Sequence, residues 1–547
     1  MKTESKKQTG SYYTPTILSD FIAYHIFGKY NFGKSINILE PSMGDGIFFE
    51  SIFHNKLFNK RFALPASISI DAVEKEKKVL LATKEKFKGL LPKSTEIQFT
   101  NEDYLDFESK NKKKFDLVIG NPPYIKSQHL TKKQIKLCET LHEKAGLEKK
   151  SIKNIWTSFL IGGVRSLSEN GVLCFVLPAE LLQVIYAKEL RELLRNTFPK
   201  IEIFTFNELI FDDIEQDVIV LICAKGCEPG VSFYHVERLE DLKEPTYTED
   251  HSNIHRKTLD KWTNYILSDS ELQFLDACKK KLLPIKDYCR AEVGIVTAAN
   301  DYFIVDKTII RDTALNRLAK PILQKGSYMP PTLSLSKADF LKIVDDGNPA
   351  FFLAFENKKE SSFPASVKQY LKKGESLKIN DRYKCQLREN WYFVPSVWIS
   401  EGFFTKRSNV FPRMVVNEAN VIVTDAFYRI RMKEGYKIKD LVFSFYNTLT
   451  FIFAELEGRY YGGSVLELTP NEYKNLSIPY KKNVSIASLN KLDKLLKSAT
   501  NIREILEFTD EIILKDTFKL TKSEILKLRE IYIKLVRRRL KKLKLKF

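Results

Sequence analysis

The sequence predicts an α/β protein that begins with a mostly parallel sheet covered by helices on both faces. Short apolar runs of strand length alternate with helical patterns over residues 10–225. This alternation is typical of parallel sheets, whose strands are apolar throughout because both faces are buried. The chain has 547 residues, 44% of them hydrophobic, which is enough for more than one large core. No apolar run approaches the ~18 residues that a membrane-spanning helix needs.

The first region, 1–230, holds all the elements of this predicted sheet. Helical patterns lie between the strand candidates, such as Ile17–Phe27 and Ala179–Arg195. Strands are expected at Ile36–Leu39, Ile68–Val73, Phe115–Ile119, Val172–Leu177 and Val218–Cys223. We therefore expect one α/β domain to end near residue 230.

The remaining chain divides into three regions that differ in amino-acid composition. Residues 231–280 are charged and contain Pro245 and three histidines, which is typical of a linker or crossover. Residues 281–485 predict a second, mixed α/β domain, because short β-like runs are broken by Pro, Gly and Asn. Residues 486–547 lack Gly and Pro and predict a helical segment. The β-like runs are Ala291–Val296, Phe303–Val305, Trp391–Val394 and Val421–Val423.

The charge balance favours an acidic partner. The chain has 88 basic and 69 acidic side chains, a surplus of 19 positive charges. Nucleic acid is the leading candidate, and a generally lysine-rich surface is the alternative. The end of the chain, Thr521–Phe547, is the most basic part, with Arg537, Arg538 and Arg539 in sequence. It could hold phosphates, bind a partner, or be an ordinary solvated helix face.

Cysteine usage and the first residues favour a protein of the bacterial cytoplasm. Seven cysteines in so long a chain do not form a disulfide framework, and their odd number fits reduced thiols. Met1–Gly10 is polar and lysine-rich, so no signal peptide is expected. No metal site is expected either, because the Cys223/Cys227 and His251/His255 spacings lack a second ligand pair.

A glycine motif follows the first predicted strand and opens a helix. It runs Glu40-Pro-Ser42-Met-Gly44-Asp-Gly46, and its glycines let the backbone turn sharply and approach a ligand closely. The dinucleotide fingerprint is not met, because a phenylalanine stands where its third glycine would be. Two further acids follow: Glu74 after the second strand, suited to ribose hydroxyls, and Asp103 before the fourth, suited to an adenine amine. Three acids without a phosphate cradle favour a nucleoside that carries an amino acid, such as S-adenosylmethionine, although such acids are commonly just solvated.

A second motif, Asn121-Pro122-Pro123-Tyr124, follows the buried strand that begins at Phe115. Its simplest interpretation is an Asn-Pro turn. However, two prolines fix two φ angles and remove two donors, which leaves outward carbonyls beside the Asn121 side-chain oxygen. Two acceptors, this oxygen and the Pro122 carbonyl, can hold both hydrogens of an amino group whose lone pair is delocalised. Tyr124 adds a flat face for a planar base, so the motif suits methyl transfer to an exocyclic or amide nitrogen.

In this order the motifs resemble those of the adenine-N6 DNA methyltransferases of the gamma class. The resemblance covers residues 10–225 and implies a Rossmann-like class I methyltransferase sheet. Thr9–Pro15 matches the leading cofactor motif and Leu209–Asp213 the base-stacking motif, whereas Met43 departs from the small residue usual there. The implied cofactor-binding residues are Tyr13, Thr14, Glu40, Ser42, Gly44, Gly46, Glu74, Asp103 and Asn121. The implied catalytic residues are Asn121, Pro122, Pro123, Tyr124 and Phe211, the last of which would otherwise be a core aromatic.

The C-terminal region resembles target-recognition domains of restriction–modification methylases, through Val293–Phe303, Asn417–Asn420 and Tyr460–Leu468. The resemblance implies a site-specific methyltransferase that flips an adenine out of duplex DNA, and it allows for a restriction endonuclease on another chain. RNA adenine or a protein glutamine amide is the alternative substrate, and a DNA-specificity module without catalysis is the alternative class. Cations and aromatics interleave in this region in a way that suits phosphate contact and base stacking: Arg382, Tyr383, Lys384, Arg388, Trp391, Tyr392, Trp398, Lys406, Arg407 and Arg413.

Overall fold

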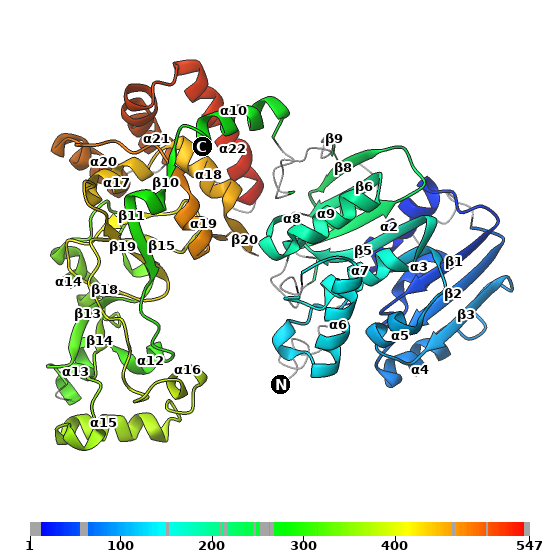
Figure 1. The fold of residues 1–547 in the computed structure, drawn as a ribbon, viewed down its shortest axis with the longest axis horizontal. Coiled ribbons are helices and arrows are strands. Elements are labelled where there is room, and N and C mark those ends of the chain that lie inside the picture. The colour runs from blue at the N-terminus through cyan, green and yellow to red at the C-terminus, as the bar shows by residue number, and fades with distance from the viewer. Residues whose placement is uncertain are drawn as a thin grey trace. The chain divides into compact units, whose positions relative to one another are not determined.

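The computed structural model divides the chain into two compact units (Figure 1). One contains the residues up to Ser268 and the other begins at Asp269, while a short stretch from Tyr461 is grouped with the first. The described residues are 13–54, 64–148, 152–206, 210–211, 217–243, 248–251, 262, 267–313, 315–461, 465–498 and 501–540. Within them, no helix is both long and apolar enough to cross a bilayer.

The first unit is built on one sheet, whose strands in the described residues run in the order β3-β2-β1-β4-β5-β7-β6-β8-β9. The first five pair in parallel, β7 is antiparallel to both of its neighbours, and β9 is antiparallel to β8. Every residue of β7 is buried, because both faces of the sheet are covered. The strands are β1 (Ser35–Glu40), β2 (Ser67–Val73), β3 (Thr95–Thr100), β4 (Phe115–Gly120), β5 (Leu167–Pro178), β6 (Lys200–Phe206), β7 (Val218–Ala224), β8 (Gly230–Val236) and β9 (Thr248–His251).

Helices connect these strands, and all five predicted strands are present. The predicted helix over 179–195 is interrupted, because the chain is extended at Val184 and continues as a short 3-10 turn. Buried Arg191 donates to the Leu181 and Val184 carbonyls, at 2.8 and 3.1 Å, and so stabilises the backbone on both sides of the interruption. The helices are α2 (Thr16–Lys29), α3 (Ile47–Phe53), α4 (Lys77–Lys86), α5 (Tyr104–Lys110), α6 (Lys132–Lys144), α7 (Trp156–Ser166), α8 (Glu180–Gln183) and α9 (Lys188–Thr197).

The segment 231–280 differs from the expected linker. Its first part is β8, which pairs in parallel with β6, and β9 then adds an edge strand. Phe233 and Val236 of β8 are buried against the core. The charged residues around them concealed this short, mostly buried strand. The end of the segment is helix α10 (Asp269–Lys279), which belongs to the second unit.

Buried Glu202 of β6 fixes helix α2 to the sheet. Its carboxylate accepts hydrogen bonds from His25 Nε2 at 3.1 Å and Tyr234 Oη at 3.0 Å, and it also contacts Lys29 and Tyr30. Burial acts to raise the pKa of Glu202, but the hydrogen bonds and charge of these partners outweigh it and hold that pKa below its usual range. The C-terminal end of α2 is thereby held against β6.

The second unit contains several small sheets in the described residues, in the orders β10-β22, β11-β19-β15-β17, β12-β14-β13-β18 and β16-β21-β20. Two aromatic-rich clusters of buried side chains lie among them. The strands are β10 (Leu283–Pro284), β11 (Cys289–Val293), β12 (Ile304–Val305), β13 (Ala319–Leu323), β14 (Phe351–Leu353), β15 (Gly402–Thr405), β16 (Arg407–Ser408), β17 (Met414–Val416), β18 (Ile422–Val423), β19 (Phe427–Met432), β20 (Arg459–Tyr461), β21 (Val465–Glu467) and β22 (Ser477–Ile478).

The mixed α/β prediction for this unit is confirmed in class, with differences in detail. The run Trp391–Val394 is not a strand, because Tyr392 is held instead by ring contacts with Phe355 and Phe363. The C-terminal helices pack on α18, so the expected boundary at 485/486 does not divide the units. The helices are α11 (Ile285–Tyr288), α12 (Asn300–Phe303), α13 (Lys307–Thr313), α14 (Lys337–Asp345), α15 (Ala365–Ser376), α16 (Tyr383–Gln386), α17 (Ile438–Phe445), α18 (Thr448–Glu457), α19 (Pro470–Asn475), α20 (Ile486–Ser498), α21 (Ile502–Asp510) and α22 (Lys522–Arg539).

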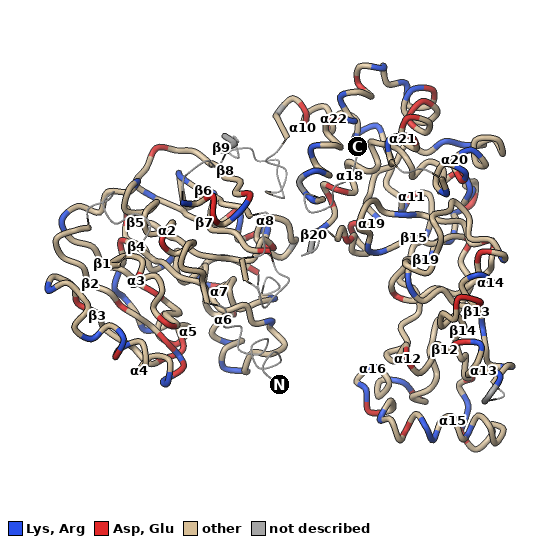
Figure 2. Tube along the Cα trace, turned by 180° about the vertical axis from the view of Figure 1, so that it is seen from behind, with Lys and Arg blue, Asp and Glu red and all other residues tan. Residues whose placement is uncertain are grey.

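The three arginines at the end of α22 do not share one environment. Arg537 is exposed, whereas Arg539 is buried and forms an ion pair with buried Glu455 of α18. Figure 2 shows basic residues along both α22 and α15. The prediction of a phosphate-binding tail therefore cannot include Arg539, and residues 541–547 lie outside the described part of the chain.

Candidate active site

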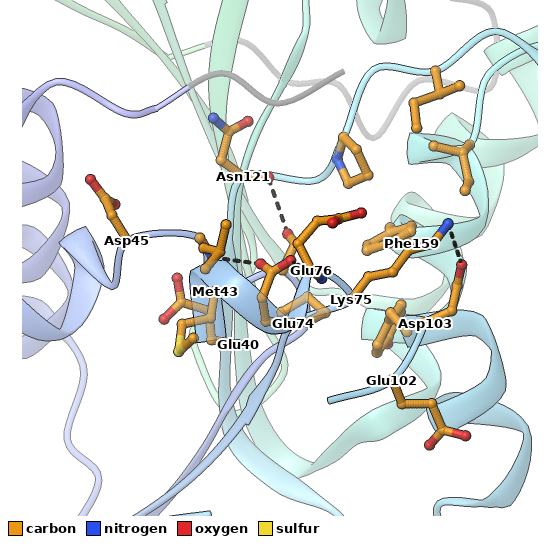
Figure 3. A pocket seen from close by; sticks show the side chains of 18 of the residues that line it. Glu40, Met43, Asp45, Glu74, Lys75, Glu76, Glu102, Asp103, Asn121 and Phe159 are labelled. Atoms are coloured by element: carbon orange, nitrogen blue, oxygen red, sulfur yellow. Dashed lines mark hydrogen bonds and ion pairs between the residues drawn. The ribbon is translucent and has the colours of Figure 1, made fainter. Parts of the chain in front are cut away.

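A pocket lies where the strand order of the first sheet reverses. Strand β1 leads outward to β2 and its other neighbour β4 leads to β5, so the crevice between β1 and β4 is a topological switch point. Ligands of open α/β sheets bind outside the carboxyl ends of the strands at such a point. The pocket has a volume of about 330 Å³ and is lined by both motifs that the sequence singled out (Figure 3).

Most of the predicted cofactor residues line this pocket, and most of the predicted base-holding residues do not. Gly46, Pro122, Tyr124 and Phe211 are absent from its lining. The predicted residues that do line it are Tyr13, Thr14, Glu40, Ser42, Gly44, Glu74, Asp103, Asn121 and Pro123.

The two glycines of the first motif have different functions in the fold. Both adopt positive φ, +57° at Gly44 and +75° at Gly46. A Cβ at Gly46 would lie 2.6 Å from the Phe87 ring and 2.9 Å from the Thr83 methyl group. Gly46 therefore permits the start of α3 to pack against α4, whereas Gly44 lines the pocket beside Tyr13.

Glu40, at the end of β1, is the most unusual group in the pocket. Its side chain is 0% exposed, and neither carboxylate oxygen has a hydrogen-bond partner. Burial, followed by the charges of Asp45 and Glu74, raises the pKa of Glu40 well above its usual range. A buried carboxyl without a partner is costly, so this one fits a ligand that brings a positive charge or donors into the pocket.

Glu74, at the end of β2, is oriented by the backbone. Its carboxylate accepts from the Gly44 and Glu76 amides, at 3.0 and 2.8 Å. Each carboxylate oxygen retains a second acceptor site, so the group can also hold neighbouring hydroxyls. This position fits the predicted contact with ribose hydroxyls.

Asp103 is held from two sides and caps helix α5. Its carboxylate accepts from the Leu105 amide at 3.1 Å and from Gln134 Nε2 at 2.9 Å. Lys75 is directed toward it, with Nζ 3.3 Å from the carboxylate (Figure 3). The carboxylate is thus fixed in place at the pocket edge.

Asn121 joins the two motifs. The Ser42 hydroxyl donates to the Asn121 main-chain oxygen at 3.1 Å, as Figure 3 shows. The Asn121 amide nitrogen in turn donates to the Thr14 hydroxyl at 3.3 Å. Three segments that are distant in sequence therefore determine the orientation of this residue.

Tyr124 and Phe211 lie together just outside the lining. The Tyr124 hydroxyl donates to the Val176 carbonyl at 3.2 Å, and both side chains are buried. Their ring centroids are 6.4 Å apart and the rings are inclined at 66°. They meet edge to face, so they do not present two parallel faces to a planar base in this conformation.

Sequence reasoning did not assign several pocket residues. Among the polar ones, Gln134 had a local signal, because Thr131 and Gln134 form a capping box at the start of α6. Phe159 of α7 is near Asp103 in Figure 3 although 56 positions separate them in sequence, so only the fold brings them together. The other unassigned lining residues include Lys75, Glu76, Glu102, His129, Leu130 and Ile155.

In the part of the chain that the structure describes, no group of three or more His, Cys, Asp or Glu residues is arranged to hold a metal ion. Cys223 is buried in β7. His255 lies outside the described residues.

A cationic hollow of about 720 Å³ lies in the second unit, around the β15–β16 connection. Lys406, Arg407 and Arg413 line it, together with one acidic residue, Asp425, and uncharged residues. Arg407 also pairs with Glu467 at 2.6 Å, and Arg413 donates to the Gly326 carbonyl at 2.8 Å. The surface is therefore basic and partly pre-formed.

The other interleaved cations and aromatics divide into structural and exposed groups. Arg388 donates to the Thr297 carbonyl at 2.8 Å and is structural. Trp398 lies between two guanidinium groups, those of Arg429 and Arg431, whose centres are 4.4 and 4.5 Å from its ring. Tyr383 and Lys384 are exposed. The glycine pair Gly462 and Gly463 lies outside the described residues.

Comparisons with known proteins agree with this geometry. The family model "Eco57I restriction-modification methylase" matches residues 49–211, and "Type II methyltransferase M.Eco57I, C-terminal domain" matches 259–514. The Type II methyltransferase M.AccI of Acinetobacter calcoaceticus is 24% identical over 544 residues, covering 90% of this chain and 94% of the relative. The Type II methyltransferase M.HincII of Haemophilus influenzae is 24% identical over 386 residues, covering 65% of this chain and 67% of the relative.

A solved structure extends the likeness to the fold. The Type IIL restriction-modification enzyme MmeI, in complex with DNA, has a TM-score of 0.59 at 12% identity, covering 97% of this chain and 75% of that chain. The acidic pocket, with its buried Glu40 and oriented Glu74, suits a cationic nucleoside. Together these findings support a Type II restriction–modification methylase, a DNA methyltransferase whose cofactor is S-adenosylmethionine.

Proposed function

We propose that the protein transfers a methyl group to the N6 amine of adenine within a specific duplex DNA sequence, as the modification enzyme of a restriction–modification system. One observation carries the adenine-N6 proposal. The Asn121-Pro-Pro-Tyr124 segment begins at the end of β4 and meets the cofactor pocket through Asn121 and Pro123. This arrangement supports a role for the segment as the amine acceptor beside the proposed cofactor site.

The chain's contribution to the reaction is positioning. Bound S-adenosylmethionine supplies an electrophilic methyl group. The Asn121 side-chain oxygen and the Pro122 carbonyl accept the two amine hydrogens and direct the nitrogen lone pair toward that methyl group. The new nitrogen–carbon bond forms as the carbon–sulfur bond breaks, and the amine then loses a proton to water. No strong base is needed, because orientation and the two acceptors lower the barrier.

Cofactor binding is proposed for the pocket residues. Glu74 holds the ribose, Asp103 contacts the adenine amine of the cofactor, and Glu40 faces its positive end. Tyr13, Thr14, Ser42 and Gly44 line the same pocket and complete the set. Gly46 contributes by permitting the turn rather than by contact.

The target adenine must leave the base stack to reach this site. Tyr124 and Phe211 are proposed to hold its ring. Because the two rings meet edge to face here, at 66°, at least one must reorient when the base enters. Tyr124 would then exchange its bond to the Val176 carbonyl for contact with the base.

Duplex DNA is the proposed substrate because of the second unit. Region 1–230 would carry catalysis, and 281–485 would read the target sequence. The cationic hollow of Lys406, Arg407 and Arg413 and the chain's surplus of 19 positive charges support phosphate contact. A separate restriction endonuclease would then act on the same sequence. A protein amide substrate would give this basic unit no evident partner.

The test uses the full chain with methyl-labelled S-adenosylmethionine and unmethylated genomic DNA. Digestion to nucleosides should place the label in N6-methyladenosine. The Asn121→Ala variant should lose at least ~100-fold in turnover while it still binds the cofactor, whereas Asn111→Ala, at a loop asparagine of the same unit, should not. Label in RNA or protein, with none in DNA, would overturn the DNA proposal. Normal turnover by Asn121→Ala would overturn the mechanism.

A further inference from the structure

The Glu40 carboxyl lacks a compensating charge within the protein. It is fully buried at the end of β1, and neither oxygen has a hydrogen-bond partner. The nearest charges, Asp45 and Glu74, are of the same sign. In a dry site a like-charged neighbour and the loss of hydration both disfavour the ionised form.

The nearby cations are engaged with other acids. Lys75 pairs with Asp103 at 3.3 Å, and Lys86 pairs with Glu50 at 2.9 Å. Neither is therefore placed to neutralise Glu40. The titratable groups that line the pocket with Glu40 are Tyr13, Asp45, Glu74, Lys75, Glu76, Glu102, Asp103, Tyr104 and His129.

We infer that Glu40 takes its compensating charge from the cofactor and releases a proton to solvent when the cofactor binds, which makes it the residue that selects the cationic cofactor over the neutral product. The inference rests on the proposed place of S-adenosylmethionine in this pocket. The cofactor carries a sulfonium charge that S-adenosylhomocysteine lacks, while both carry the same ammonium and carboxylate, so the inference places the sulfonium beside Glu40. An ionised Glu40 is favourable beside the cofactor and costly beside S-adenosylhomocysteine.

The consequence for turnover is direct. When the methyl group leaves, the sulfur loses its charge and Glu40 loses its counter-ion. Glu40 then regains a proton or weakens its hold on the product. The pocket would therefore favour release of the product and entry of fresh cofactor without any movement of the backbone.

The sign of the pH dependence follows from the raised pKa of Glu40. Below the pKa of the empty pocket, binding must remove a proton, so cofactor affinity increases as the pH rises. Above it, the carboxyl is already ionised and affinity becomes independent of this group. The Glu40→Gln variant should show no such slope from this position.

Calorimetry of the full chain with unlabelled S-adenosylmethionine tests the inference without any measurement of methyl transfer. Titrations at several pH values, each in buffers of different ionisation enthalpy, give the protons released per cofactor bound. At a pH below the pKa of Glu40 in the empty pocket, wild-type protein should release close to one proton with S-adenosylmethionine and far less with S-adenosylhomocysteine. Sinefungin, which has an amine in place of the sulfonium, should behave like the cofactor.

Two variants test whether the proton release comes from Glu40. Glu40→Gln, which has the shape of the neutral carboxyl and should fold, should abolish this release and bind S-adenosylmethionine ~10-fold or more weaker, with little change for the product. Glu76→Gln, at an exposed carboxylate of the same pocket, should keep the proton release. Equal release by wild type and Glu40→Gln, or unchanged preference between cofactor and product, would overturn the inference. Absence of N6-methyladenosine would instead refute only the proposed reaction.

Discussion

Exchanging Arg539 for methionine should destabilise the second unit far more than the same exchange at Arg537, two positions earlier on α22. Arg539 is buried, and its guanidinium lies 2.6 Å from a carboxylate oxygen of Glu455 on α18. It also donates to the main-chain oxygens of Asn409 and Val410, the latter at 2.7 Å. One side chain thus connects α22, α18 and the loop that lines the cationic hollow.

The magnitude follows from what the exchange leaves behind. Glu455 is 2% exposed, so Arg539→Met would remove the guanidinium that pairs with a buried carboxylate. Removing one partner of a buried ion pair costs about 3–5 kcal/mol. Arg537 is exposed, so Arg537→Met should change stability by no more than about 0.5 kcal/mol.

Urea unfolding of the full chain measures the difference. Because the two units can unfold in separate steps, hydrogen exchange of α18 and α22 should identify which transition belongs to the second unit. The double variant Arg539→Met/Glu455→Met should regain most of the loss, since two apolar groups can replace a buried pair. Equal, small shifts for Arg539→Met and Arg537→Met would refute this reasoning.

Three further outcomes are expected. Gly46→Ala should lower the free energy of unfolding by about 2–5 kcal/mol, because alanine would adopt positive φ and its Cβ would lie 2.6 Å from the Phe87 ring. Thermal unfolding measures this, and an unchanged melting temperature would contradict the prediction. Glu202→Gln should destabilise the protein at neutral pH. Its loss of stability relative to wild type should shrink as the pH falls below about 4, because the lowered pKa of Glu202 makes a contribution to stability that acid removes. Melting temperatures of both proteins from pH 7 to 3 measure this, and a constant difference between them would argue against it. Thr14→Val should reduce kcat by about 10-fold at saturating substrates, because the Thr14 hydroxyl accepts a hydrogen bond from the Asn121 amide, and Thr14→Ser should restore kcat. A change confined to the KM for the cofactor would show that Thr14 contributes only to cofactor binding.

The first unit was largely predictable because its signals are local. A parallel sheet buried on both faces needs continuous apolar strands, and five such runs were visible in the sequence. The missed strands were β3, β6, β8 and β9, and two of them have weak patterns. β3 lies at the sheet edge with no buried residue, and β8 stands in charged surroundings. The helix expected over 179–195 failed at Val184, where a buried arginine satisfies the carbonyls of an interrupted turn.

The pocket residues that follow strands were predictable from the sequence, whereas the contacts between distant pocket residues were not. Glu40 and Asn121 were found because each follows a strand, and neighbouring parallel strands present their carboxyl ends together. The contact of Asn121 with Thr14, and the bond of Gln134 to Asp103, join positions 107 and 31 residues apart. No local pattern encodes such distances.

By itself, therefore, the sequence determined the α/β sheet, the order of its motifs and the acidic residues that line the pocket, since backbone turns, proline and strand periodicity depend on adjacent residues. Tertiary structure alone decided the environment of each side chain. Arg537 and Arg539 are alike in sequence, but one is solvated and the other is buried against Glu455. Glu40 and Glu76 are both pocket acids, but only Glu40 loses all contact with water. Desolvation depends on every element packed around a group, and for that reason it appears only when the chain has folded.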